Sequence, residues 1–406
     1  MTDPGEPAPQ SVRTYGDLFA LREFRNLFLN RLFVMASIAM SGLALGTIVY
    51  DATGSTVLTA LAMFGGPLVT LLGSATVLGA SDTVGPRRAM TLVCLVLALE
   101  AAVQSIPGLP WPFRFVLLVI PYAMNAMFGG MVTRLLRGTV SDEAFVLGRA
   151  TLNLAIGVMQ VIGYAVGGFL LHHLPATAIF AIAAVLAVAA ALVTRFGLRE
   201  LPATQSRDRL VARTHAVNVS LLTSRVTGPI YAASWVPNGL IVGCEALFIP
   251  YGGPSVAGYL FAATASGMLL GDIVVGRFVT PAWRNRLIDP LRLLLALPYL
   301  GFFLGPPVPV AIGLGFVASF GYAAALGLQD RLVRTSDPAL SGQVFGLLGN
   351  GVMVGQAVGA LAAGAVAVWL PVASTMGWLA VASVAVSLAL VVPLRRSTLT
   401  LTGRSS

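Results

Sequence analysis

The chain is dominated by a succession of apolar runs, each about as long as a helix that crosses a lipid bilayer. A transmembrane helix needs about 20 predominantly apolar residues. Charged residues make up 10% of the chain, against roughly 25% in a soluble globular domain. The pattern excludes a soluble globular protein and predicts an all-α integral membrane protein with twelve transmembrane helices. The runs are 27–49, 57–79, 90–106, 114–132, 150–171, 177–196, 228–249, 256–276, 290–304, 308–329, 344–370 and 374–394.

The positive charge between these runs predicts the orientation of the chain. All 25 basic residues are arginine, and with a cytoplasmic N-terminus only Arg114 would lie on the outer side. Cytoplasmic loops of membrane proteins carry an excess of Lys and Arg. We therefore expect both termini in the cytoplasm and the chain in the plasma membrane, which is the inner membrane of the cell. The net charge of +9 follows from this sidedness and does not indicate nucleic acid as a partner.

Hydrophilic segments divide the chain into parts. Residues 1–26 are expected to form a cytoplasmic tail that ends in a short amphipathic helix. Six apolar runs occupy 27–196, the longest hydrophilic connection is 197–227, and six more runs occupy 228–394. Residues 395–406 are expected to form a second cytoplasmic tail. No small-residue cleavage site follows the first run, so we expect this run to remain as a transmembrane helix.

The two halves carry an internal repeat. At an offset of 197 residues Phe64 coincides with Phe261 and Arg87 with Arg284. Two parallel six-helix repeats leave a cavity between them, and rocking exposes this cavity to each side in turn. We therefore expect two pseudo-symmetric six-helix bundles. Further matches, at 197 or 196 residues, are Gly79 with Gly276, Arg134 with Arg331, Arg137 with Arg334, Asn153 with Asn350, Gln160 with Gln356, Gly163 with Gly359 and Gly168 with Gly364.

The connection between the second and third runs carries a motif of charges and glycines. The motif residues are Gly79, Asp82, Gly85, Arg87 and Arg88. Together with the repeat and the long central loop, this motif resembles the loop signature of the major facilitator superfamily, although Thr83 replaces its first arginine. The end of the first run, at 50–55, further resembles bacterial twelve-span exporters of the siderophore and macrolide type.

The resemblance implies a secondary transporter that works by alternating access. We expect proton-coupled export of a small, largely apolar compound by a monomer whose partners are this substrate, protons and the lipid bilayer. Uptake of a small organic solute is the alternative, and an intramembrane enzyme or a receptor without transport is the third possibility. A chain without lysine has no Gly-x-x-x-x-Gly-Lys-Ser/Thr nucleotide loop. We expect no cofactor, and no metal site from two cysteines and three histidines.

The resemblance also implies an inner gate at the cytoplasmic ends of the spans. Asp82 would pair with Arg134 or Arg137 at the end of the fourth span, with Arg87 and Arg88 beside it, and would latch the gate in the outward-open state. The alternative is a set of solvated loop charges. Exposed ion pairs contribute at most about 1 kcal/mol each.

Polar residues inside the apolar runs are candidates for the substrate cavity, because a charge at the bilayer centre costs at least about 2.5–3.5 kcal/mol. By resemblance, the first, fourth, seventh and tenth spans line the cavity. Arg31 has the alternative of extending to the inner surface, and Gln160 and Gln356 that of holding the halves together. The predicted cavity residues are Arg31, Asn125, Gln160, Asn238, Tyr322 and Gln356.

Two acids inside the runs are candidates for proton coupling. Glu245 lies about one turn from the outer end of the seventh run, on a span that the resemblance places along the cavity. It is either a proton carrier or a charge of the outer vestibule. Glu100 lies near the middle of the third run, on a span that is usually peripheral. Its alternative is a structural carboxyl that is bonded within the bundle to Gln104, so we favour Glu245.

Overall fold

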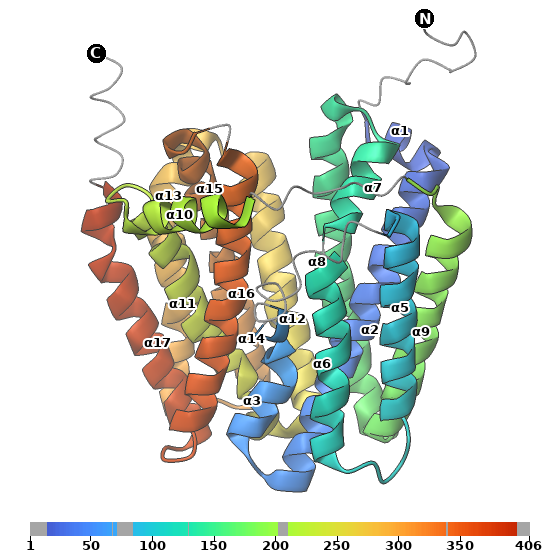
Figure 1. The fold of residues 1–406 in the computed structure, drawn as a ribbon. Helices are drawn as coiled ribbons and strands as arrows, with labels where there is room; N and C mark the ends of the chain where they lie inside the picture. The colour runs from blue at the N-terminus through green and yellow to red at the C-terminus, as the bar shows by residue number, and fades with distance from the viewer. Residues whose placement is uncertain are drawn as a thin grey trace, which may run out of the picture.

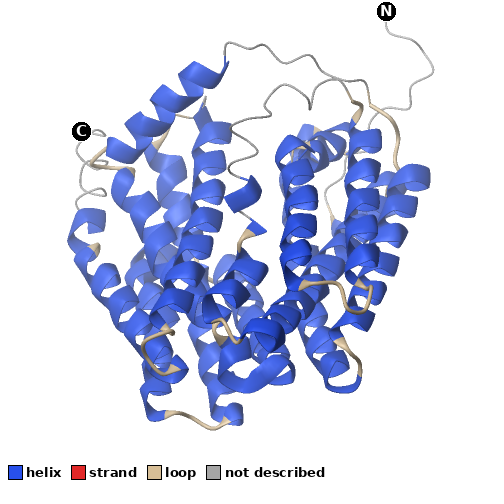
Figure 2. Ribbon diagram, turned by 60° about the horizontal axis from the view of Figure 1, so that its bottom comes forward, coloured by secondary structure: helices blue, strands red, loops and turns tan. Residues whose placement is uncertain are grey.

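In the computed structural model, the described part of the chain comprises residues 14–66, 68–70, 84–128, 130–201, 210–337 and 340–395, and it is helical without a strand (Figures 1 and 2). The helices in chain order are α1 Tyr15–Ala20, α2 Arg22–Thr53, α3 Thr56–Phe64, α5 Pro86–Gln104, α6 Trp111–Phe128, α7 Met131–Thr139, α8 Asp142–His173, α9 Ala176–Gly197, α10 Leu210–Thr223, α11 Gly228–Ala246, α12 Phe248–Phe278, α13 Pro281–Ala296, η1 Leu297–Leu304, α14 Val308–Phe320, η2 Gly321–Ala323, α15 Ala324–Thr335, α16 Ser341–Val366 and α17 Val372–Ala389.

Among these residues, eight helical segments are long and apolar enough to cross a membrane. The four other predicted runs coincide at least in part with α3, α5, α6 and α11. The predicted all-helical, multi-pass membrane class is therefore supported. The eight segments are Arg22–Thr53, Leu147–His173, Ala176–Gly197, Phe248–Phe278, Pro281–Leu304, Val308–Thr335, Gln343–Val366 and Val372–Arg395.

Local sequence explains where several helices begin and end. Thr14 Oγ1 accepts from the Asp17 amide at 3.2 Å, and the Asp17 carboxylate accepts from the Thr14 amide at 2.9 Å, which is a reciprocal capping box. Gly54 ends α2 with a φ of 61°, a conformation that glycine adopts without steric cost. The Ser55 hydroxyl then accepts from the Leu58 amide at 3.3 Å and starts α3. This short turn makes α2 and α3 antiparallel neighbours.

The helices pack as two groups that stand side by side (Figure 1). In the first group (α2 to α9), α2 packs against α8 and α9, and α5 packs against α9. In the second group (α11 to α17), α11 packs against α16 and α17, and α12 packs against α14. The groups meet where α8 packs along α12 and α3 along α16. We call the end that carries α1, α10 and the last turn of α17 the terminal face (top of Figure 1), and the other end the opposite face.

Glycines bring the two groups into close contact toward the opposite face. The backbones of Gly168 in α8 and Gly258 in α12 touch, so a β-carbon on either would collide with the other. The Thr56 hydroxyl of α3 donates to the carbonyl of Gly364 in α16 at 2.6 Å. Small residues allow such approach in lipid, where apolar burial gives no driving force for helix association. The repeat-matched Gly168 and Gly364 thus both lie at contacts between the groups.

A second repeat-matched glycine pair makes equivalent contacts within each group. Gly163 of α8 packs against Ala39 of α2, and Gly359 of α16 packs against Gly239 of α11. In both cases the partner is the first long helix of its group. The equivalence gives the sequence repeat a physical meaning, because helix packing at these positions leaves no room for a larger side chain.

The connection between the two groups contains a helix that the sequence analysis did not anticipate. Helix α10, within the hydrophilic segment 197–227, lies across the terminal face, roughly perpendicular to the long helices (Figure 1). It contacts α11 and α16 and therefore packs on the second group. The central connection thus includes a helix that packs on one of the two groups.

Candidate functional site

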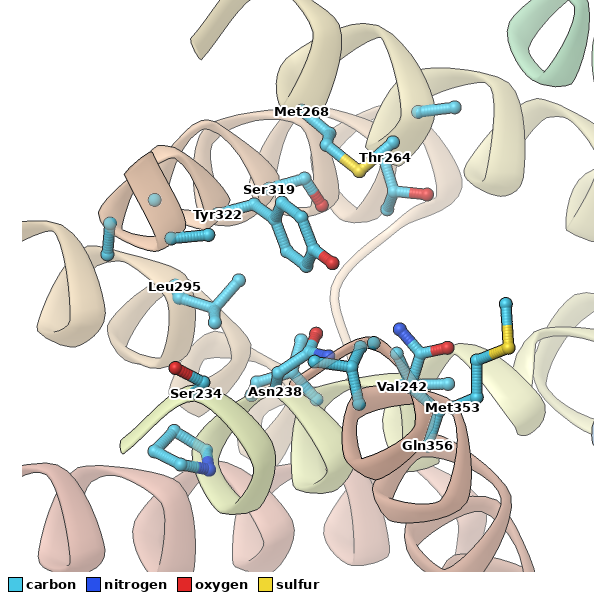
Figure 3. A pocket seen from close by; sticks show the side chains of 18 of the residues that line it. Ser234, Asn238, Val242, Thr264, Met268, Leu295, Ser319, Tyr322, Met353 and Gln356 are labelled. Atoms are coloured by element: carbon cyan, nitrogen blue, oxygen red, sulfur yellow. The ribbon is translucent and has the colours of Figure 1, made fainter. Parts of the chain in front are cut away.

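A cavity of about 580 Å³ lies between the two helix groups. Ligand pockets in proteins commonly measure about 300–1,000 Å³, so a small organic molecule fits this space. Residues of α3 and α8 line it from the first group, and residues of α11 to α16 line it from the second. Figure 3 shows the part formed by the second group, where polar and apolar side chains alternate around the space.

Aromatic side chains form the floor of the cavity, toward the opposite face. Tyr164 of α8 stacks on Phe261 of α12 with ring centroids 4.7 Å apart. Phe64 and Phe248 contact the same ring with centroids at 6.4 and 4.9 Å. The Gly168–Gly258 contact lies one turn beyond this floor. From the floor, the lining residues continue along α8 toward the terminal face, and the cavity is closed on the opposite side.

Four of the six predicted cavity residues line this space: Gln160, Asn238, Tyr322 and Gln356. Asn238 is 6% exposed and its amide nitrogen has no hydrogen-bond partner among the described residues. The Tyr322 hydroxyl and the amides of Asn238 and Gln356 point into the cavity in Figure 3. Gln160 lies one helical turn before Tyr164 on α8, and both line the cavity. The residues come from α8, α11, η2 and α16, which shows that both halves of the sequence contribute polar groups.

The other two predicted cavity residues are not placed at this site. Arg31 of α2 does not line the cavity, and it interacts electrostatically with Cys94 of α5. Its neighbour Asn30 is 1% exposed and donates to Thr194 Oγ1 at 2.8 Å. Arg31 therefore belongs to the packed interior of the first group, because α2 turns this face toward α5 and α9. The side chain of Asn125 lies outside the described part of the structure.

The two candidate acids occupy different environments. Glu245 is half-buried and lines the cavity, as does Thr264 of α12, whose hydroxyl donates to the Phe261 carbonyl at 3.0 Å. Glu100 is 5% exposed, lies away from the cavity, and accepts from Gln104 Nε2 at 2.9 Å. The bond to Gln104 is the structural alternative that the sequence analysis kept open for Glu100.

Arg114, the only arginine predicted on the outer side, completes the network around Glu100. It is 2% exposed and donates from Nη1 to the Gln104 carbonyl at 2.6 Å and to Gln104 Oε1 at 3.2 Å. Its Nε donates to the Leu109 carbonyl at 3.2 Å. These hydrogen bonds hold the loop between α5 and α6 at the opposite face. The buried polar groups of α5 therefore have a structural role.

The predicted inner gate is only partly within the described structure. Asp82 lies outside the described residues. Arg87 Nε pairs with Glu200 Oε2 at 3.0 Å, and Arg88 Nε lies 3.5 Å from the same oxygen. Glu200, just after α9, was not identified from the sequence, because its partner is far away in the chain.

The remaining two gate arginines lie on α7. The Arg137 guanidinium lies over the Phe145 ring, 5.0 Å from its centroid. Arg134 Nη1 lies 3.8 Å from the sulfur of Met131. Both therefore stay at the terminal face, near the start of α8, where the predicted latch would need them.

The lining residues that the sequence analysis did not predict include Arg149, Tyr164 and Arg292. Arg149 and Tyr164 follow the helical stripe of α8 that also carries Gln160, so their spacing was a usable signal. Arg292, which lies near the start of the predicted run 290–304, is 2% exposed inside α13. It donates to Asp289 Oδ1 and to the Ser387 carbonyl, both at 3.1 Å. Helix α13 begins eleven residues before Arg292, at Pro281, where proline occupies the first helical turn.

Within the described residues, no group of three or more His, Cys, Asp or Glu side chains is arranged to hold a metal ion. The floor and walls of the cavity instead offer amides, hydroxyls, aromatic rings and one carboxyl. These groups can bind and orient an organic molecule, and the carboxyl can take up and release a proton.

Comparison with known proteins identifies the fold but not the family. No protein-family model matches the chain, and no curated protein matches its sequence. Among solved structures, a POT family transporter in complex with 5-aminolevulinic acid superposes with a TM-score of 0.74 at 13% identity, covering 96% of this chain and 99% of that one. A peptide transporter POT in complex with sulfate gives a TM-score of 0.72 at 13% identity, with 96% of each chain covered.

A third similar structure is a bacterial homolog of the human lysosomal transporter Spinster, in an inward-facing and occupied conformation. Its TM-score is 0.67 at 14% identity, covering 93% of this chain and 96% of that one. The protein has the fold of these membrane transporters. The finer resemblance to exporters is not confirmed by these structures.

Proposed function

We propose that the protein is a secondary active transporter that moves a small organic solute by alternating access, coupled to protons. The observation that carries this proposal is the cavity between two helix groups, closed toward one face by the Tyr164–Phe261 stack and the Gly168–Gly258 contact. Rocking of two such groups exposes a single site to each side in turn. The fold shared with solved transporters supports the proposal. The protein needs no cofactor for this work and is not an enzyme.

The sidedness and the division of the chain are part of the proposal. We infer twelve spans in bundles 27–196 and 228–394, joined by a cytoplasmic connection at 197–227 and flanked by the cytoplasmic tails 1–26 and 395–406. The arginine distribution makes the terminal face cytoplasmic. The protein is then an inner-membrane monomer, and the conformation described above faces the cytoplasm.

Cysteine labelling in intact cells tests this orientation. In a background with both native cysteines replaced, an impermeant reagent should label Ile106→Cys, which lies exposed in the α5–α6 loop, and should leave Gln205→Cys unlabelled. Permeabilised cells provide the control, because Gln205→Cys should then react. Labelling of Gln205→Cys from outside would refute the orientation.

Export of a small, largely apolar compound is the first candidate for substrate and direction. The apolar lining supports it, since the cavity includes Phe64, Phe261 and the flexible thioethers of Met268 and Met353. Promiscuous binding sites often use such adaptable side chains.

Uptake of a polar organic solute is the second candidate. It is favoured by the three charged residues that line the cavity, Arg149, Glu245 and Arg292. Such anchors suit a substrate with ionised groups. The solved transporters of this fold include complexes with 5-aminolevulinic acid and with a thioalcohol-conjugated peptide.

Transport by the purified chain in liposomes of known orientation tests the function and separates the two candidates. Amphipathic dyes represent the first candidate, and 5-aminolevulinic acid and a dipeptide represent the second. Export should drive a dye toward the acidic compartment, while uptake should drive a polar solute away from it. Either transporter should also exchange labelled for unlabelled substrate without a gradient. If folded protein shows neither gradient-driven transport nor exchange for any probe, the transport proposal is wrong.

Within this mechanism we assign Glu245 as the proton carrier. The substrate site then comprises Gln160, Asn238, Tyr322 and Gln356. The inner gate comprises Asp82 with Arg87, Arg88 and either Arg134 or Arg137. Glu200, which pairs with Arg87 and Arg88 in this structure, competes with Asp82 for these arginines. These assignments are tested below by substitution.

A further inference from the structure

The short helix η1 carries a buried hydroxyl without a partner, on Tyr299. The side chain is fully buried, and its hydroxyl makes no hydrogen bond within the described structure. A buried polar group normally has a partner, because leaving it unsatisfied costs free energy that no apolar contact returns. The same position would pack as well with phenylalanine. An orphan hydroxyl here therefore calls for a partner in another state of the protein.

Tyr299 lies directly behind the deep end of the cavity. It follows Leu295 by one helical turn, and Leu295 lines the cavity whereas Tyr299 does not. In the neighbouring helix α11, Glu245 likewise follows the lining residue Ile241 by one turn. Tyr299 belongs to the same core cluster as Ile241 and Cys244, the residue that precedes Glu245. The charge of Glu245 acts on the Tyr299 hydroxyl.

The other two tyrosines near Glu245, Tyr164 and Tyr322, line the cavity. Tyr164 stacks on Phe261. Tyr322 points into the cavity, where a substrate reaches it (Figure 3). The titratable and polar groups around the Glu245 carboxyl are Tyr164 of α8, Cys244 of α11, Thr264 of α12, Tyr299 of η1 and Tyr322 of η2. Of the three tyrosines, Tyr299 alone lacks both a partner and access to the cavity.

We propose that Tyr299 is a positioning residue for proton coupling, whose hydroxyl hydrogen-bonds the Glu245 carboxyl when this carboxyl turns away from the cavity. The inference rests on the proposed transport function. With the cavity open, the carboxyl faces Thr264 and exchanges its proton with cavity water. During the change of state the protonated carboxyl leaves the cavity and bonds to Tyr299. The proton stays on Glu245 throughout, and Tyr299 keeps its own.

This geometry explains how the proton is carried without leaking. A carboxyl that stayed in the cavity would exchange its proton with water at any moment of the cycle. A second hydrogen-bonding position on the dry side of α11 holds the protonated group until the cavity opens again. Both partners lie in the second helix group, so rocking of the groups leaves them within reach of each other.

The test is Tyr299→Phe, with Tyr231→Phe as the matched control. Tyr231 is equally buried, but its hydroxyl donates to the Val344 carbonyl at 3.2 Å and lies several turns from Glu245. Tyr299→Phe should melt at or above the wild-type temperature, because it removes an unsatisfied hydroxyl. It should still lower proton-driven transport by about fivefold relative to gradient-free exchange, as expected for coupled residues. Tyr231→Phe should lower the melting temperature and leave this ratio unchanged.

A double substitution completes the experiment. In the Glu245→Gln background, Tyr299→Phe should change proton-driven transport by less than about twofold, because the two residues act together. Equal losses in both backgrounds, or an unchanged ratio in Tyr299→Phe, would overturn the inference. If Glu245→Gln itself keeps proton-driven transport, the failure lies in the assignment of Glu245. If Glu245→Gln uncouples transport and Tyr299→Phe does not, only the role of Tyr299 is wrong.

Discussion

Membrane-depth polar side chains on α2 and α5 of the first group and on α11 of the second group are used in opposite ways. In the first group, Asn30 bonds to Thr194, and Glu100 bonds to Gln104, so these side chains are satisfied by neighbours in the same group. In the second group, Asn238 and Glu245 line the cavity, and the Asn238 amide nitrogen has no partner among the described residues. Depth in the membrane is therefore a poor guide to function. What separates the two sets is whether the helix group supplies the hydrogen-bond partner.

The largest expected difference between the groups concerns the two acids. Glu245→Gln should reduce proton-driven transport by at least about tenfold, equal to 1.4 kcal/mol of activation free energy, and should keep gradient-free exchange. Glu100→Gln should keep both activities, because its amide oxygen still accepts from Gln104. Both rates are measured in proteoliposomes with and without a pH gradient. Loss of gradient-driven transport in Glu100→Gln alone would reverse the comparison.

The buried asparagines give the second contrast. Asn30→Ala should destabilise the protein by about 1–3 kcal/mol, because it leaves buried acceptors without a donor, and should keep the transport rate per folded molecule. Asn238→Ala should lose less stability and should raise the substrate concentration needed for half-maximal transport several-fold. Thermal unfolding in detergent and transport kinetics distinguish the two. The same phenotype in both variants would mean that the cavity amide is structural.

The terminal face gives a smaller contrast, because its charges are partly solvated. Asp82→Asn should lower turnover about two- to fivefold with little loss of expression, since it removes a pair that forms in one state of the cycle and leaves apolar packing intact. Glu200→Gln is the companion variant, because Glu200 holds Arg87 at 3.0 Å in the present conformation. Opposite shifts in the ratio of inward- to outward-facing labelling are expected. Unchanged turnover in Asp82→Asn would make it an ordinary loop charge.

The smallest effect is expected for the ion pair of the second group. Arg284 Nη1 lies 3.1 Å from Asp330 Oδ2, and both side chains are partly exposed. Asp330→Asn should change stability by at most about 1 kcal/mol and leave transport unaltered, because solvent screens such pairs. Its repeat-equivalent position is occupied by Thr133, so the first group has no counterpart. A transport defect in Asp330→Asn would show that the second group also contributes a gate.

The sequence allowed the all-helical, multi-pass class to be predicted, because this class depends on the length and composition of local apolar runs. Four cavity residues were predicted from polarity within apolar runs. The roles of Arg292, Glu200 and Tyr299 were not predicted, since they depend on contacts with distant segments. Arg292 donates to the Ser387 carbonyl, and Glu200 pairs with Arg87. Arg31 is not among the lining residues of the described cavity, and one sequence does not reveal which face of α2 meets α5.

The glycine contact between α8 and α12 has a consequence for the proton gradient across the membrane. If the protein transports as we propose, the touching backbones of Gly168 and Gly258 would exclude ions as well as the substrate at this point. A methyl group at Gly168 would wedge the two helices apart and admit a file of water beside the floor. The resulting passive proton conductance would dissipate membrane energisation even in cells that meet no substrate. Selection at this position would then act through growth yield rather than through transport.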